Sequence, residues 1–390
     1  MIARIVIPLL LIIVLSDVYI DAHYFRKRVH ITWQQRLAWW IPTIFLVVYT
    51  CILASIHNLA PTNLTWLNTY LFLLGAFVAP KTIFGICSLV GSLVRKTIVK
   101  TRRNYGHYVG LAAGIAAFLV YVYGLTFGFS QIRVRHITLN VSNLPKNFDG
   151  YRIVQVSDMH IGTFNGWRRF ILEHEMDSIK HQNANLIVFT GDLQNMRPSE
   201  ILPFTNLLKT SMKNAIAVRG NHDYTEYVKL NPKEAEQQNN DFANIVRHKL
   251  GWNLLENNHI TIKRGNDSIV IAGTENDGKP PFPQKANYQK ALQGVAKGAF
   301  VIMLQHDPSA WRRHILPKNI AQITLCGHTH GGQMQFLGFR PTEIREENDY
   351  GVYRSGNHFL NVTDGLGGFA PFRVNMPNEI VVITLKAKTT

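Results

Sequence analysis

The chain has 390 residues, and its formal net charge is +16. The first 130 residues carry eleven lysines and arginines against two acids, a surplus of +9, and the other 260 residues carry +7. Because the excess charge is divided between two different kinds of sequence, it does not require a nucleic-acid partner. Three cysteines exclude a disulfide framework.

Four long apolar stretches occupy the first 130 residues, near residues 2–20, 37–56, 69–94 and 107–129. Each is close to the roughly 20 residues that cross a bilayer as a helix, so we expect a multi-pass transmembrane region at residues 1–130. The first stretch lacks the small-residue cleavage site of a removable signal peptide. Gly110 and Gly114 form a small-residue face, which favours close packing inside the four-helix unit over a dimer.

The loops between these stretches differ in charge, and residues 57–68 contain no lysine or arginine. Basic residues crowd the first loop (Arg26, Lys27, Arg28, Arg36) and the third loop (Arg95, Lys96, Lys100, Arg102, Arg103). The positive-inside rule predicts that both loops are cytoplasmic, which places the N-terminus and the domain after residue 130 on the periplasmic or extracellular side. Arg133 and Arg135 oppose this orientation only weakly, because long domains translocate largely regardless of their charge.

Lys81 follows Pro80 inside the third apolar stretch. An ionisable residue at this depth is by default a functional hypothesis. The alternative is that Pro80 breaks the helix and Lys81 lies near a polar cavity or extends towards the membrane surface. The sequence leaves both interpretations open.

Beyond residue 130, five short apolar runs are each followed by a polar motif. The runs are Arg152–Val156, Leu186–Phe189, Ala215–Val218, Phe300–Leu304 and Ile323–Leu325. Short apolar runs rich in β-branched residues predict buried strands. In open α/β sheets the ligand crevice lies beyond the carboxyl ends of the strands, so the five motifs are expected to converge on one place.

The side chains of these motifs suit a pair of divalent metal ions. The seven candidate ligands are Asp158, His160, Asp192, Asn221, His306, His328 and His330. Asp192 is the natural bridging carboxylate, and the i, i+2 spacing of Asp158 and His160 would put both side chains on one face of an extended segment. His222 adjoins a candidate ligand and is our candidate for the general acid that protonates the leaving group.

Two ions about 3.5–4 Å apart can clamp the attacking and the leaving oxygen of an in-line displacement. Nitrogen and oxygen ligands without thiolate favour Mn, Fe, Zn or Co over Mg or Ca. The sequence does not choose among these four metals. Cys326 precedes one motif in a buried run, so we interpret it as a small hydrophobic residue and not as a catalytic thiol.

Taken in order, the motifs resemble the signature of the calcineurin-like metallophosphoesterases over about residues 135–390. They are Ser157-Asp158-Met159-His160, Thr190-Gly191-Asp192, Gly220-Asn221-His222-Asp223, Gln305-His306-Asp307 and Cys326-Gly327-His328-Thr329-His330-Gly331-Gly332-Gln333. The resemblance implies a sandwich of two β-sheets flanked by helices, with a dinuclear site at the sheet edge. It also implies a ligand set for each metal: Asp158, His160, Asp192 and His330 for the first, and Asp192, Asn221, His306 and His328 for the second.

The form Gly-His-Thr-His-Gly-Gly-Gln is similar to a membrane-associated branch that includes lipid-directed phosphoesterases and UDP-diacylglucosamine hydrolases. Asn195 departs from the family pattern, in which many members carry an aspartate three residues after the bridging one. A hydrogen-bonding role would survive this change, whereas a role that needs a charge would not.

Other residues near the motifs have two interpretations each. Residues 226–248 read as a surface helix or a lid, and Arg197, Arg219 and Arg340 as phosphate contacts or solvated charges. The aromatic residues Trp167, Phe170, Phe369 and Phe372 would form a rim for a lipid chain or pack in the core.

We therefore expect a four-helix transmembrane region at residues 1–130 and an α/β metallophosphoesterase domain at residues 131–390. The domain would hydrolyse a phosphodiester, phosphomonoester or pyrophosphate bond in a lipid-linked or cell-envelope substrate. One alternative is a non-catalytic membrane receptor or scaffold that binds a phosphorylated ligand. Another is a cytoplasmic-side enzyme that acts as a UDP-diacylglucosamine pyrophosphatase. The sequence does not identify the substrate-binding residues.

Overall fold

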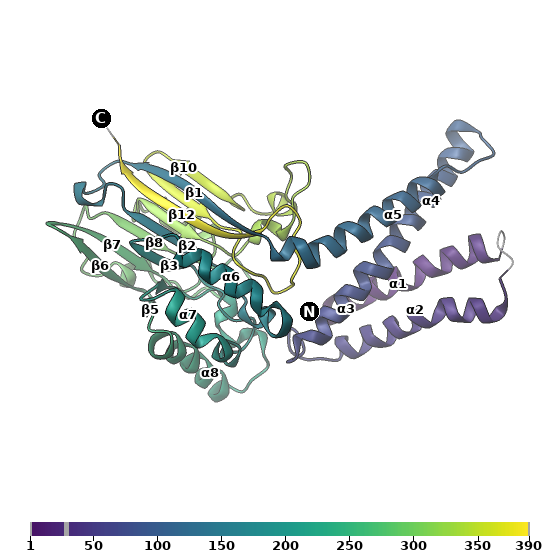
Figure 1. Cartoon of the computed structure of the whole chain (residues 1–390), viewed down its shortest axis with the longest axis horizontal. Coiled ribbons are helices and arrows are strands. Elements are labelled where there is room, and N and C mark those ends of the chain that lie inside the picture. The colour runs from purple at the N-terminus through teal and green to yellow at the C-terminus, as the bar shows by residue number, and fades with distance from the viewer. Residues whose placement is uncertain (1, 27–30, 389–390) are drawn as a thin grey trace. The chain divides into compact units, whose positions relative to one another are not determined.

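The computed structural model describes residues 2–26 and 31–388, and the chain divides into two compact units, Met1–Thr126 and Phe127–Thr390 (Figure 1). Lys27 and Arg28, which we counted in the first basic loop, lie outside the described residues. Each unit is described by itself below.

The first unit confirms the four expected membrane helices. Its candidate spans are Ile2–Phe25, Trp33–Ala54, Leu64–Val99 and Gly106–Gly128. They contain the helices α1 (Val6–Ile20), α2 (Trp33–Ala54), α3 (Leu64–Leu73), α4 (Ala79–Val94) and α5 (Gly106–Tyr123). The third span has 36 residues and is longer than the sequence predicts, because α3 and α4 join through a single π-helical turn at Leu74–Val78.

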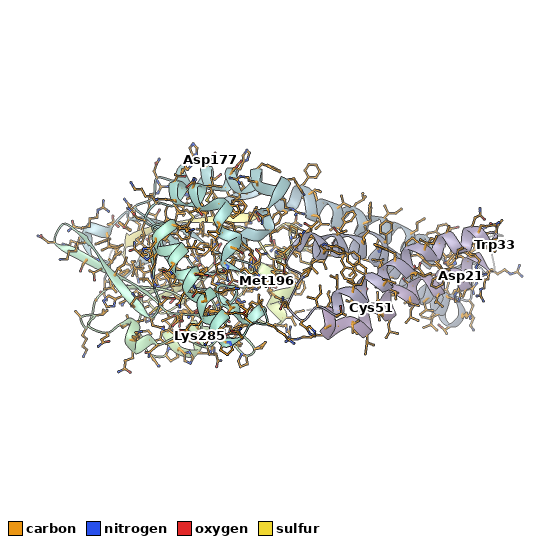
Figure 2. The ribbon with its side chains drawn as sticks, turned by 90° about the horizontal axis from the view of Figure 1, so that it is seen from below. Asp21, Trp33, Cys51, Asp177, Met196 and Lys285 are labelled. Atoms are coloured by element: carbon orange, nitrogen blue, oxygen red, sulfur yellow. The ribbon has the colours of Figure 1, made fainter. Side chains whose placement is uncertain are left out.

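Polar contacts fix how these four helices pair. The guanidinium of Arg36 at the start of α2 donates to both carboxylate oxygens of Asp21, at 2.8 and 2.6 Å. Figure 2 shows Asp21 and Trp33 near one end of this unit and Cys51 nearer the other, as an antiparallel pair requires. The Ser88 hydroxyl lies 2.9 Å from both the Tyr24 hydroxyl and Nδ1 of His107. The first and third loops therefore lie at the same end of the unit.

Lys81 has a defined partner inside this unit. Its Nζ lies 2.9 and 2.8 Å from the two carboxylate oxygens of Asp17, which also accepts from Thr43. The helix is continuous through Pro80, so the interpretation in which Pro80 breaks it is wrong. An ion pair thus joins α1 to α4.

Small residues bring α4 and α5 into close contact. A Cβ atom added at Gly110 would lie 2.9 Å from the Phe84 carbonyl oxygen, and one added at Gly114 would lie 3.0 Å from that of Pro80. The small-residue face is therefore used for packing inside the unit.

The second unit contains two six-stranded sheets. The first has the order β1-β12-β2-β3-β4-β5. Its strands are β1 (Ile132–Val141), β12 (Asn378–Ala387), β2 (Arg152–Val156), β3 (Leu186–Phe189), β4 (Ile216–Ala217) and β5 (Asn253–Leu254). Strand β12 is parallel to β1 and antiparallel to β2, and β2 to β5 are parallel to one another.

The second sheet has the order β10-β11-β9-β8-β7-β6. Its strands are β10 (Gly351–Ser355), β11 (His358–Val362), β9 (Ile323–Cys326), β8 (Val301–Leu304), β7 (Asp267–Gly273) and β6 (Asn258–Arg264). Strands β11, β9, β8 and β7 are parallel, and the two edge strands are antiparallel to their neighbours.

Alternating side chains divide the apolar core into layers, as the two-residue period of a strand dictates. Ile153 of β2 packs between the sheets with Ile302 of β8, whereas Val154 faces the helices on the outer side of the first sheet. These helices are α6 (Arg169–Lys180), α7 (Thr205–Ser211) and α8 (Pro232–Asn244) (Figure 1). A third cluster around Trp311, with α9 (Tyr288–Ala291) beside it, covers the second sheet. The expected two-sheet sandwich flanked by helices is confirmed.

The segment that we read as a surface helix or a lid is mainly α8. Asn231 begins this helix as part of a capping box with Glu234. Phe242 and Val246 are buried in the core outside the first sheet, so the segment is a surface helix that packs on the domain.

Candidate metal centre

All eight predicted site residues come together where the parallel strands of both sheets end. The potential ligand atoms form three groups, and within each group they lie within 4.8 Å of one another. The groups are Asp158, His160 and His330; His160, Asp192 and His222; and Asp192, His306 and His328. Asn221 joins them, since its Oδ1 lies 3.2 Å from Nε2 of His306. Asp192 belongs to two of the groups, which is the position a bridging carboxylate would need.

The backbone that carries these residues is not extended. The φ angles of Asp158 and His160 are 52° and 44°, and those of His328 and His330 are 75° and 52°. Our expectation that Asp158 and His160 lie on one face of an extended segment is therefore wrong, and His328 and His330 are not extended either. Each motif turns through left-handed conformations directly after its strand, and these turns bring both side chains of a pair to the centre.

Gly191 shows why the backbone is so constrained. Its φ is 101°, and a Cβ atom there would lie 2.6 Å from the Gly220 nitrogen and 2.7 Å from Nδ1 of His306. Only glycine allows this approach, which lets the loops that carry Asp192 and Asn221 meet.

Asp223 holds the same two loops together. Its buried carboxylate accepts from the backbone N–H groups of Gly220, Asp192 and Leu193 at 2.8–2.9 Å, and from that of Gln194 at 3.2 Å. Burial, together with the charge of Asp192, raises the pKa of Asp223 to about 7. Sequence reasoning quoted Asp223 in the Gly-Asn-His-Asp motif but gave it no role.

Two neighbours orient Asn221 and His222. Nδ1 of His222 lies 2.6 Å from the carbonyl oxygen of Asn195, which leaves Nε2 as the nitrogen free for proton transfer. The Tyr227 ring stacks on His222 at 4.3 Å between centroids, and its hydroxyl accepts from the Asn221 amide at 2.7 Å. The Asn195 side chain instead donates to Thr163, so a charge at position 195 is not needed to hold His222. Tyr227 was not singled out from the sequence.

Burial and charge perturb the imidazoles in opposite directions. Burial lowers the pKa of His160 and of His330 to about 3, so both rings are neutral near pH 7. Burial acts in the same sense on His306, but the carboxylate of Asp192, 3.2 Å away, outweighs it and raises the pKa of His306 to about 10. Neutral imidazoles are the form that binds a metal ion.

Nitrogen atoms without hydrogen-bond partners are a second reason why these residues fit divalent ions. Both ring nitrogens of His160 and Nδ1 of His330 are buried and have no hydrogen-bond partner among the described residues. A buried polar atom without a partner is costly unless a water or an ion satisfies it. Cys326 takes no part, since it is buried behind the site and burial raises the pKa of its thiol. The candidate donors gathered around Asp192 are nitrogen and oxygen atoms, without a thiolate.

Two of the three arginines proposed as phosphate contacts are engaged elsewhere. Arg219 is buried, its Nε lies 2.6 Å from Glu256, and it donates to the Asp223 carbonyl. Arg340 makes two hydrogen bonds to Asp349, at 2.7 and 3.1 Å. Both guanidinium groups are therefore engaged in contacts within the domain.

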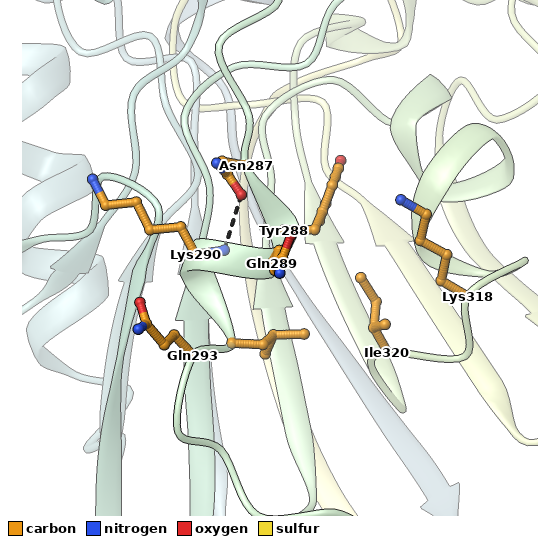
Figure 3. A pocket seen from close by; sticks show the side chains of 8 residues that line it. Asn287, Tyr288, Gln289, Lys290, Gln293, Lys318 and Ile320 are labelled. Atoms are coloured by element: carbon orange, nitrogen blue, oxygen red, sulfur yellow. Dashed lines mark hydrogen bonds between the residues drawn. The ribbon is translucent and has the colours of Figure 1, made fainter.

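A surface depression of about 710 Å³ lies around Tyr288, Lys290 and Lys318 (Figure 3). None of the eight predicted site residues lines it. It is separate from the metal ligands and is not the candidate catalytic site.

Two family profiles match the chain. The profile of the calcineurin-like phosphoesterases matches residues 151–332, which contain all eight predicted site residues. A profile described as a probable calcineurin-like phosphoesterase transmembrane domain matches residues 3–129, the helical unit.

Three relatives illustrate the range of the similarity. An uncharacterized metallophosphoesterase of Aquifex aeolicus is 30% identical over 263 residues, which cover 66% of this chain and 93% of the relative. A transmembrane protein with metallophosphoesterase domain of Danio rerio is 26% identical over 364 residues, covering 88% of this chain and 77% of the relative. The UDP-2,3-diacylglucosamine pyrophosphatase LpxG of Chlamydia trachomatis is 25% identical over 302 residues, covering 62% of this chain and 86% of the relative.

Proposed function

The chain belongs to the calcineurin-like metallophosphoesterases, and from this premise we propose that it hydrolyses a phosphodiester or pyrophosphate bond in a lipid-linked substrate at a dinuclear metal site. The observation that carries the proposal is the convergence of seven nitrogen and oxygen donors around Asp192, with His222 beside them.

We assign the donors to two ions that share Asp192. Asp158, His160 and His330 surround one position, and Asn221, His306 and His328 surround the other. When bound, such ions polarise the phosphoryl oxygens and lower the pKa of a bound water. The Nδ1–H of His222 donates to the Asn195 carbonyl, so it is the imidazolium form of His222 that would deliver its Nε2 proton to the leaving oxygen.

A lipid-linked substrate is supported by the rest of the chain. Four membrane spans exceed what a tether needs, and the likeness to LpxG favours a pyrophosphate that carries acyl chains. Phe369 contributes an apolar wall, since its ring lies 5.7 Å from His222 and 6.4 Å from His160 between centroids. We also propose that the domain faces the periplasmic or extracellular side, because both basic loops lie at one end of the helical unit.

The reaction class is tested with bis(p-nitrophenyl) phosphate and detergent-purified protein, with Mn, Zn, Mg or a chelator added. Asp192→Asn should lose bound metal and activity together. His222→Ala should keep its metal and slow turnover, most for poor leaving groups. If His222→Ala empties the site, our role assignment for His222 is wrong, and if the wild type binds two metals without turning over any ester, the binding-protein alternative is favoured.

The substrate class is tested by comparing a nucleotide-linked lipid and a phospholipid with a soluble phosphodiester. Equal or faster turnover of the soluble ester would contradict the lipid preference.

The side of the membrane is tested with Asn183→Cys, an exposed position in the loop before β3. Labelling by an impermeant thiol reagent in intact cells would support the outer side, and labelling only after lysis would support the cytoplasmic alternative.

A further inference from the structure

The segment that follows the Gly-His-Thr-His-Gly-Gly-Gln motif forms a short hairpin with an apolar tip. Phe336 and Phe339 pair across the turn through two backbone hydrogen bonds of 2.9 Å. Leu337 at the tip is 108% exposed, and Phe336, Phe339 and the following Ile344 are also exposed. Three large apolar side chains within four residues of a loop tip are unusual on a soluble surface. We call residues 334–340 the apolar hairpin.

The backbone of the tip makes the choice of leucine more unusual. Leu337 and Gly338 have φ angles of 49° and 87°, so both central residues of the turn are left-handed. Such turns favour Asn, Asp or Gly, and a bulky residue at positive φ is an outlier. Leu337 therefore carries two costs, backbone strain and the exposure of its whole side chain to water.

The apolar hairpin lies beside the segment that leads into β12, because the Gln335 N–H donates to the Val374 carbonyl at 2.9 Å and β12 begins at Asn378; the residue that follows the last membrane span contacts the same place. That span ends at Gly128, and the next residue, Phe129, is buried against Phe164 with ring centroids 5.7 Å apart. The Phe129 carbonyl accepts from Asn378, at the start of β12. Because β12 is antiparallel to β2, this start lies beside the end of β2, where the Asp158 motif begins.

A second exposed apolar element lies in the segment that follows the predicted ligand His160. Trp167 and Phe170 are exposed, and the Arg168 guanidinium lies over the Trp167 ring at 4.6 Å. Segment 369–370 lies between the approaches to the two elements: the Phe369 carbonyl accepts from Thr163, four residues before Trp167, and the Ala370 carbonyl accepts from Gln333, which directly precedes the hairpin. Tryptophan and arginine together are typical of the level of the lipid headgroups.

We propose that the apolar hairpin inserts into the surface of the lipid bilayer that holds the chain's own membrane spans, with Leu337 at the deepest point and Trp167 beside it. Insertion removes the exposed leucine and phenylalanine surface from water, which offsets the strain of the left-handed turn. It would bring the rim of the metal centre to the membrane surface. This inference goes beyond the proposed function and does not depend on catalysis.

The hairpin binds through its apolar surface and not through charge. Arg340 is paired with Asp349, and three acids follow the hairpin at Glu343, Glu346 and Glu347. A neutral phosphatidylcholine bilayer is therefore a sufficient partner, and added anionic lipid should not strengthen insertion.

The test measures the depth of a fluorescent probe in the full chain. Leu337→Cys is labelled with nitrobenzoxadiazole in a background in which the lipid-exposed Cys51 and the partly buried Cys87 are replaced, and the protein is reconstituted into phosphatidylcholine liposomes. Asn266→Cys is the matched control, because it is an exposed turn residue at the opposite end of the second sheet from the metal residues. We expect a blue-shifted emission at position 337 and at least threefold stronger quenching by headgroup-level spin-labelled lipid than at position 266.

Two results would overturn the proposal. Equal quenching of both probes by aqueous iodide would show that the hairpin lies in water. Protection of the Leu337 probe from both iodide and spin-labelled lipid would show that it docks on protein. A probe at Phe339→Cys guards against a local effect of the first label, and its lipid quenching should fall at least twofold when Leu337→Asn is added.

Discussion

Asp223→Asn is the substitution that most directly tests how the metal centre is held. Four backbone N–H groups point at the Asp223 carboxylate, two at each oxygen. An amide keeps one acceptor oxygen and turns an NH₂ group towards the other two donors. Above pH 7, where the carboxylate of Asp223 is ionised, losing two hydrogen bonds to this charged acceptor, each worth about 1.5–3 kcal/mol, gives an expected loss of about 3–6 kcal/mol. The substitution should also displace Asp192 and Asn221, and this displacement would be observed as weaker metal binding.

The assay titrates Mn into metal-free protein and follows the thermal unfolding midpoint with and without the metal. We expect the affinity of Asp223→Asn to fall about 10- to 100-fold, as for other groups that orient metal ligands. Glu379→Gln is the control, because this buried carboxylate accepts from Arg133 and Arg135 and contacts none of the predicted ligands. It should lower the midpoint and leave the affinity unchanged. Wild-type affinity in Asp223→Asn would refute the reasoning.

Three further predictions concern other parts of the chain. Tyr227→Phe removes the hydrogen bond to the Asn221 amide but keeps the stack on His222, so metal affinity should fall about fivefold, which corresponds to about 1 kcal/mol, in the same titration. Asp17→Asn leaves Lys81 without its charged partner and should cost about 3–5 kcal/mol, seen as a lower unfolding midpoint in detergent that Lys81→Met largely restores. Burial raises the pKa of Glu200 to about 7. Because Glu200 ionises at a lower pH in the unfolded chain than in the folded chain, this residue should lower the free energy of unfolding by up to about 3 kcal/mol between pH 4.5 and 7, and the midpoints of Glu200→Gln should fall by correspondingly less over this range than those of the wild type.

The sequence predicted those parts of the fold that depend on local patterns. The four membrane spans follow from apolar length, and β2, β3, β8 and β9 follow from short apolar runs. The order of the strands did not follow, because it depends on contacts between distant segments. Strand β12 lies between β1 and β2 although more than 200 residues separate it from either, and no local pattern encodes that insertion.

In the site, too, local patterns predicted the identity of the residues but not their geometry. The motifs identified which side chains meet, but the conformation that brings them together was predicted wrongly, because φ depends on the neighbouring loops. Gly191, for example, meets Gly220 and His306 from two other segments. Asp223 and Tyr227 acquire their roles only through contacts with Gly220, Asn221 and His222. Spacing alone does not reveal such contacts.

The strain in the metal centre links its geometry to its chemistry. Five of the seven predicted ligands have positive φ, namely Asp158, His160, Asp192, His328 and His330. Each such residue costs on the order of 1–3 kcal/mol, and the sum approaches the whole stability of a typical domain. Hydrogen bonds such as those from the backbone nitrogens of Asp158 and His160 to the carbonyls of Gly191 and Asp192 offset part of this cost.

The partnerless nitrogens of His160 and His330 add to the cost and have no such offset among the described residues. Metal ions would supply partners to these nitrogens while holding the strained carboxylates in place, and folding and metal binding would then be strongly linked. The rigid backbone also explains why the strain persists: glycines and Asp223 fix the loops before any metal arrives, so the ligands are already arranged around Asp192. A centre arranged in this way loses little conformational entropy on binding, and the free energy of metal binding can appear as stability of the whole domain.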